Sequence, residues 1–138
     1  MHWAWYAANH LREKSGTVVC ASGITPSGEF HLGHLREILS AEMIHRACRD
    51  LGIESKYVFI VDSMDPLRRV YDFLSPAYEE YIGHPLAYIP APDKYGNPGD
   101  GSISYSEHFL SPFLESLSKI GVSVKPEDVI RNHETYES

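Results

Sequence analysis

The segment from Ser22 to His34 reads SGITPSGEFHLGH and directly follows the apolar run Thr17–Ala21. The apolar run is typical of a parallel strand buried on both faces, and the segment after it is rich in Gly, Ser, Thr and Pro. A long amphipathic stretch begins near Leu32. A strand, a tight loop and a helix in this order open a nucleotide-binding α/β unit, in which backbone N–H groups and the positive helix end meet an anion.

The loop contains neither G-x-G-x-x-G nor G-x-x-x-x-G-K-[ST], which argues against a standard dinucleotide fold and a Walker loop. It carries His31-Leu32-Gly33-His34 instead. Two imidazoles one helical turn apart can donate hydrogen bonds to phosphate oxygens, and Gly33 allows a close approach to the backbone. Metal binding would need a third ligand, and none lies nearby in the sequence. Surface histidines at the start of a helix are the remaining alternative.

The rest of the chain predicts a parallel sheet and its helices. Apolar periodicity predicts helices over residues 3–14, 32–50 and 105–120, strands over 17–21, 57–61 and 122–124, and a helical turn at 126–128. The first helix should carry Trp3, Ala7, Ala8 and Leu11 on one side. Residues 75–102 are rich in Pro and Gly and predict an irregular region. Since parallel strands end at one edge, the loops at 22–30 and 62–69 should face one crevice.

Bulk composition narrows the class of protein. The 138 residues suit one domain, and no apolar run approaches the ~20 residues that span a bilayer. Cys20 and Cys48 lack metal-type spacing and are expected to be reduced core residues, so we expect a cytoplasmic protein with no membrane partner. The net charge of −7 opposes nucleic-acid binding by this segment alone, since Arg68-Arg69 is its one concentrated basic spot.

The motifs together resemble the class I lysyl-tRNA synthetases. His-x-Gly-His alone is shared with adenylyl- and cytidylyltransferases, but the string Ser22–Gly28 followed by His31, Gly33, Arg36 and Glu37 is more specific. The resemblance also covers His2-Trp3-Ala4, Asp62–Val70, Tyr81-Ile82-Gly83, Pro85-Leu86, Tyr105 and Glu107-His108-Phe109. It therefore spans nearly the whole chain.

This resemblance implies an α/β fold: a parallel-sheet, Rossmann-like nucleotide-binding half-domain of the HxGH class I synthetase type. It implies a lysine–tRNA ligase, which activates lysine with ATP (and Mg²⁺) and transfers it to tRNA-Lys. A Lys-Met-Ser-Lys-Ser-like loop, zinc-type cysteine pairs and an anticodon-binding part are not in the sequence. We therefore expect residues 1–138 to be the N-terminal portion of the catalytic domain, inactive alone in aminoacylation, with tRNA bound mainly by other parts.

The resemblance also implies roles for single residues. Those expected in catalysis are His31 and His34, and those expected to bind ATP are Ser27, His31, Gly33 and His34. Those expected to bind lysine are Gly23, Thr25, Asp62, Asp65, Tyr105 and His108. An acidic loop suits an ammonium group, although which aspartate meets it stays open. Turn chemistry for the loop residues and packing for the aromatic ones are the alternatives. No metal site is predicted, and no role is assigned to the remaining histidines, which are His2, His10, His45, His84 and His133.

Two other functions remain open. A small stand-alone HxGH nucleotidyltransferase would need later basic or Ser/Thr-rich phosphate motifs, and none follows Ser102. A non-catalytic paralogue would keep an adenosine or lysine pocket without the reaction.

Overall fold

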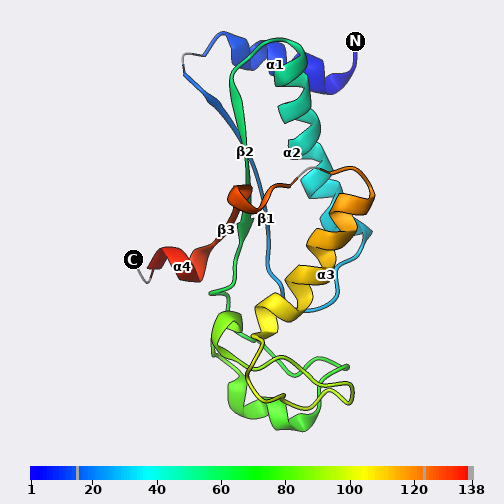
Figure 1. Cartoon of the computed structure of the whole chain (residues 1–138), viewed down its shortest axis with the longest axis vertical. Coiled ribbons are helices and arrows are strands. Elements are labelled where there is room, and N and C mark those ends of the chain that lie inside the picture. Colours follow the sequence, from blue (N-terminus) through cyan, green and yellow to red (C-terminus); the bar gives the residue numbers. More distant parts are fainter. Residues whose placement is uncertain (15, 123, 137–138) are drawn as a thin grey trace.

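Three parallel strands form the sheet at the centre of the computed structural model, which describes residues 1–14, 16–122 and 124–136. The strands lie in the order β1 (Val18–Ile24), β2 (Ser55–Val61) and β3 (Val129–Arg131). Helix α2 (Leu32–Asp50) connects β1 to β2, as Figure 1 shows. The predicted α/β class, the strand–loop–helix order and the bounds of α2 are confirmed.

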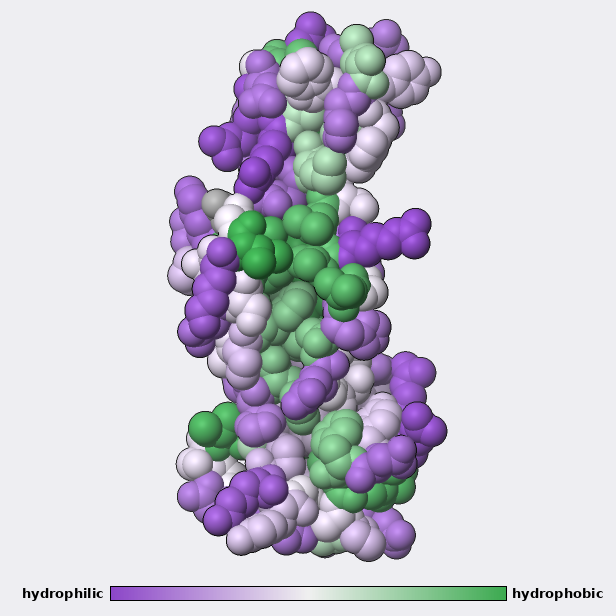
Figure 2. Space-filling view, turned by 90° about the vertical axis from the view of Figure 1, so that its right-hand side faces the viewer, coloured by the Kyte–Doolittle hydropathy of each residue, from purple (hydrophilic) through white to green (hydrophobic). Residues whose placement is uncertain are grey.

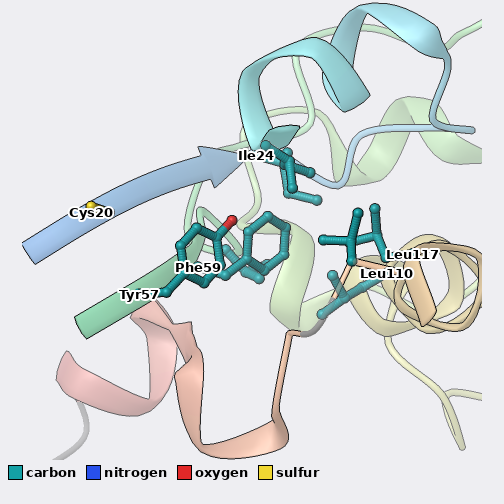
Figure 3. Packing of buried hydrophobic residues seen from close by; sticks show 9 residues of the cluster. Cys20, Ile24, Tyr57, Phe59, Leu110 and Leu117 are labelled. Carbon is teal, nitrogen blue, oxygen red and sulfur yellow. The ribbon is translucent and has the colours of Figure 1, made fainter. Parts of the chain in front are cut away.

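The main core lies between the sheet and the helices α2 and α3 (Tyr105–Lys119), which cover the same face. Figure 3 shows Ile24 and Phe59 from the strands pointing toward Leu110 and Leu117 from α3. Figure 2 views the helical side and shows hydrophobic surface gathered at its middle. The partly buried apolar residues of the two helices that pack against this core include Leu35, Leu39, Phe113 and Leu114.

The opposite face of the sheet is not covered by any helix in the described part of the chain. Along β1, Cys20, Ser22 and Ile24 are buried, whereas Val19 is 60% exposed. Ile60 of β2 and Ile130 of β3, on the same face as Val19, are 41% and 40% exposed. The expectation that the first strand is buried on both faces is therefore wrong, because the apolar run reflects a face that the described helices leave open.

Helix α1 (Trp3–Arg12) packs on α2 rather than on the sheet. Their contact buries Ala4, Ala8, Ala47 and Cys48. Trp3, which was predicted on the same side of this helix as Ala8, is about half exposed, because the small alanines let the two helices approach closely. Both cysteines are free and buried, as expected for core residues.

The third strand is not where the apolar pattern predicts it. The expected strand at 122–124 includes residue 123, which lies outside the described residues, and Val122 is buried without strand pairing. The predicted turn is the 3-10 helix η3 (Pro126–Asp128), and β3 follows it. β3 exists because Val129–Arg131 pairs with Phe59–Val61 of β2, a contact that no local pattern encodes.

The irregular region contains two 3-10 helices, η1 (Pro76–Tyr81) and η2 (Leu86–Tyr88). It forms the lower lobe in Figure 1 and has a small core of its own. That core joins Leu67, Leu74, Tyr78, Leu86 and Ile89 to Tyr105 and Phe109 of α3. Within the described ranges, none of the helices has both the length and the apolar character needed to cross a bilayer.

Candidate active site

The carboxyl ends of the three strands bring most of the predicted site residues to one edge of the sheet. β1 and β2 are tied there by the Asp62 N–H, which donates to the Ile24 carbonyl at 2.8 Å. Gly23 lies within β1 and not in the loop, because the strand pairing continues through Ile24. A Cβ on Gly23 would lie 3.3 Å from the Ile60 carbonyl oxygen, so the residue allows the two backbones to come close.

The two imidazoles cap the start of α2. His31 accepts the Gly33 N–H on its Nδ1 at 3.0 Å, and His34 accepts the His31 N–H on its Nδ1 at 3.2 Å. The ring centroids are 4.1 Å apart. Because each Nδ1 is an acceptor, the neutral ring carries its proton on Nε2. Each histidine therefore keeps one N–H donor beyond the cap.

Burial lowers the pKa of His34, and the charge of the neighbouring His31 lowers it further, against smaller opposing effects of the backbone hydrogen bond with His31 and of Glu37. The neutral, Nε2-protonated form is therefore favoured near pH 7. The first turn also explains Gly33, since a Cβ there would lie 2.8 Å from Cε1 of the His31 ring. Glycine lets that ring fold back over the helix start.

Tyr105 holds the loop between β1 and α2 in place. Its side chain is fully buried, and its hydroxyl donates to the Ser27 carbonyl at 2.6 Å. Burial raises the pKa of this phenol, which keeps it a donor. The loop turn itself is closed by the Ser27 N–H on the Thr25 carbonyl at 2.9 Å. The structure thus places Tyr105 as an anchor of the loop with its hydroxyl already engaged.

His108 lies beside the loop, on α3. It lines two adjoining pockets of about 380 and 610 Å³, together with Glu29 and Phe109. The larger pocket also reaches Ser27 and Gly28. His108 therefore faces space next to the glycine-rich loop, while Tyr105 does not.

The two aspartates after β2 differ in their partners. Asp65 accepts hydrogen bonds on both carboxylate oxygens from Arg68, each at 3.1 Å. Asp62 accepts one from the side-chain amide of Asn132 at 2.5 Å. Among the residues that the structure describes, no Lys, Arg or His forms an ion pair with Asp62. Both carboxylates are partly buried, and because Asp65 alone is paired with an arginine, the charge of Asp62 is the less compensated of the two.

The sequence did not indicate the three polar residues at the end of β3 and directly after it, Arg131, Asn132 and His133. Arg131 pairs with Glu107 of α3. Asn132 accepts the Met64 N–H and the Ser63 hydroxyl on its Oδ1, each at 2.9 Å, and Nδ1 of His133 lies 2.6 Å from the Ser63 hydroxyl. The signal that could have found them is a polar run directly after the apolar pair Val129–Ile130. It was missed because the strand was expected earlier in the chain.

Across residues 1–14, 16–122 and 124–136, no three His, Cys, Asp or Glu side chains gather as a metal site would require.

Comparison with known proteins shows the family of the chain. The family model described as tRNA synthetases class I (K) matches residues 1–138. The lysine–tRNA ligase of Archaeoglobus fulgidus is 48% identical over 136 residues, which are 99% of this chain and 26% of that protein. Lysine–tRNA ligase 1 of Methanosarcina acetivorans is 43% identical over 99% of the chain and 24% of its own length. That of Picrophilus torridus is 45% identical over 92% of the chain and 23% of its own length.

The chain thus spans about a quarter of the length of these relatives. The match of the family model extends over the whole chain, and the parallel sheet with its His-x-Gly-His helix start has the form that the sequence resemblance implied. The chain belongs to the class I (K) family of tRNA synthetases.

Proposed function

We propose that this chain is the N-terminal portion of a lysine–tRNA ligase catalytic domain and that it holds ATP and lysine for the activation step. The observation that carries the proposal is the start of α2. Both imidazoles there have Nδ1 occupied by backbone N–H groups, which leaves two Nε2 donors at a positive helix end. This arrangement suits the phosphates of ATP, which is bound with Mg²⁺ as substrate.

In the activation step the lysine carboxylate attacks the α-phosphorus, an O–P bond forms, and pyrophosphate leaves with the electrons of the broken bond. Negative charge grows on the phosphorus oxygens in the transition state. Fixed donors that need no reorganisation stabilise that charge better than water does. His31 and His34 are proposed as these donors, and the loop at Ser27 and the helix start at Gly33 as the surface that holds the nucleotide.

For lysine, the proposal assigns Asp62 rather than Asp65 to the side-chain ammonium. The charge of Asp65 is already balanced by Arg68, whereas Asp62 has no cationic partner among the described residues. Gly23 and Thr25 lie at the end of the neighbouring strand, where they are proposed to meet the polar ends of the amino acid. His108 is proposed as a further lysine-binding residue at the edge of the site. The contribution of Tyr105 is indirect, because its hydroxyl holds the Ser27 carbonyl.

The tRNA-Lys partner is proposed to bind mainly through parts of the protein other than this chain. The net charge of −7 disfavours contact with phosphates, which requires clustered Lys and Arg. The proposed place of the reaction is the cytoplasm.

The test is pyrophosphate exchange into ATP by the product of the complete gene in which this chain lies. Exchange should depend on lysine and not on the other amino acids. Exchange driven by another amino acid would contradict the lysine assignment. Exchange that needs no amino acid would favour a nucleotidyltransferase instead, and ATP or lysine binding without exchange would favour the non-catalytic paralogue.

The lysine assignment is tested by a matched pair of variants in the same protein. Breaking a buried charged pair costs about 3–5 kcal/mol, so Asp62→Asn should raise the KM for lysine by about 10²-fold to several thousandfold with little change in the KM for ATP. Asp65→Asn loses an exposed pair worth ~1 kcal/mol or less and should change the lysine KM much less. Equal effects of both changes, or no effect of Asp62→Asn, would reject the assignment.

A further inference from the structure

We propose that Asn132, at the start of α4 (Asn132–Tyr136), is a positioning residue that orients the Asp62 carboxylate toward the ammonium of the substrate. This inference rests on the proposed function, since it concerns how the same lysine site is built. It begins from the hydrogen bonds of one side-chain amide.

The Asn132 amide contacts three consecutive residues after β2. Its Nδ2 donates to Asp62 Oδ1 at 2.5 Å, and its Oδ1 accepts from the Met64 N–H and the Ser63 hydroxyl at 2.9 Å each. The Met64 N–H can only donate, so the amide oxygen must face it and the amide nitrogen must face Asp62. The orientation of the Asn132 side chain is therefore determined by the backbone.

A second set of contacts holds the amide in place. The Ser63 hydroxyl has a single proton, which it donates to Asn132, so His133 must donate to Ser63 through Nδ1. Ser63 is fully buried. The polar chain His133, Ser63, Asn132, Asp62 thus ends on the Asp62 carboxylate, and the group that contacts this carboxylate is the neutral amide of Asn132.

Asp62 is fixed at both its backbone and its side chain. Its N–H donates to the Ile24 carbonyl, and its Oδ1 is tied to Asn132, which leaves Oδ2 for a further partner. A neutral amide orients the carboxylate without cancelling its charge, whereas Arg68 engages both oxygens of Asp65. A carboxylate held in one orientation binds an ammonium group without paying further side-chain entropy.

The decisive variant is Asn132→Asp in the complete protein, measured by lysine-dependent pyrophosphate exchange. The new carboxylate keeps the acceptor for Met64 and Ser63 but replaces the donor to Asp62 with a like charge. At pH 8 the lysine KM should rise about 10- to 100-fold, while kcat changes less. As the pH falls toward about 6, a proton shared by the two carboxylates restores an O–H donor, and the lysine KM should recover relative to the unmodified protein.

Two further variants keep the test interpretable. Tyr136→Asp adds the same charge to α4 at a side chain that is 76% exposed, and it should leave the lysine KM and its pH profile unchanged. The double exchange Asp62→Asn with Asn132→Asp preserves one charge and the hydrogen bond between the two positions. It should unfold at nearly the temperature of the unmodified protein and still show the raised lysine KM.

The outcomes separate the inference from the proposed function. Absence of lysine-dependent exchange in the unmodified protein would count against the proposed function itself. With that exchange present, an unchanged lysine KM in Asn132→Asp would overturn the inference. So would a KM raised equally at every pH, which a purely structural role predicts, or a normal lysine KM in the double exchange.

Discussion

Each imidazole at the start of α2 uses its two ring nitrogens for two different interactions. Nδ1 accepts a backbone N–H and caps the helix, and Nε2 carries the proton that is free to meet a ligand. The lowered pKa of His34 fits this division, because protonation of Nδ1 would break the capping bond. Capping and phosphate binding are thus performed by the same two rings.

Loss of one ring should therefore affect the reaction more than ATP binding. In the complete protein, His34→Ala should lower the rate of pyrophosphate exchange by about 10- to 1000-fold, as for other lost donors to a charged transition state. The KM for ATP should change far less. The matched control is His10→Ala on α1, which removes an exposed histidine and should leave the rate unaltered. Unchanged exchange in both His31→Ala and His34→Ala would refute the donor role.

The first turn of α3 joins the loop after β1 to the end of β3. Ser104 caps the helix through the Glu107 N–H, Tyr105 holds the Ser27 carbonyl, and Glu107 pairs with Arg131. The same end of the helix packs its aromatic residues into the core of the irregular region. Three segments that are distant in the sequence are thus fixed by one helical turn.

The variant Tyr105→Phe tests whether the contact of this helical turn with Ser27 stabilises the fold. The ring remains, but the Ser27 carbonyl loses its donor in a buried place, which costs about 1–3 kcal/mol. Denaturant unfolding of the chain should show a lower free energy of unfolding by this amount. Tyr6→Phe removes a hydroxyl from an exposed ring of α1 and should change it by ~0.5 kcal/mol or less. Equal values for the two variants would mean that the Ser27 contact contributes nothing.

Across the molecule, the sheet has one face packed by α2 and α3 and one face left open in the described residues. Val19, Ile60 and Ile130 lie on that open face, and Ile60 and Ile130 are next to the strand ends that carry the candidate site. Burial lowers the pKa of His45, whose ring contacts the Ser55 hydroxyl, and it also lowers the pKa of His34.

These two shifts predict acid sensitivity. Because the folded chain binds protons less readily than the unfolded chain at both histidines, their contribution to stability is complete above about pH 6.5 and is lost as the pH falls. The unfolding temperature of the chain should therefore be lower at pH 5 than at pH 7.5. His45→Gln should flatten the profile. An unfolding temperature that is constant or higher at pH 5 would contradict the shifts.

Residues 1–138 by themselves should not transfer lysine to tRNA. The net charge of −7 opposes contact with tRNA phosphates, and Arg68 of the one basic pair is engaged with Asp65. Labelled lysine, tRNA and ATP with the purified chain provide the measurement, and the complete protein provides the control. Robust charging by the chain alone would show that it contains the whole activity.

The amino-acid sequence by itself predicted the elements whose signals are local. The strand–loop–helix order, the bounds of α2, the extent of α3 and the turn at Pro126–Asp128 follow from periodicity, glycine stops and caps between near neighbours. The same is true of the family, because His31 to His34 and the loop before it form one continuous motif. These features depend on residues a few positions apart, which a pattern can show directly.

The folded chain alone determined the features that depend on distant partners. The place of β3, the open face of the sheet, the anchoring of Ser27 by Tyr105 and the difference between Asp62 and Asp65 all arise from contacts between separate segments. The bond from Asn132 to Asp62 joins residues 70 positions apart. Such partners are chosen by packing and hydrogen-bond geometry across the whole domain, and neither quantity is encoded in a local pattern of residues.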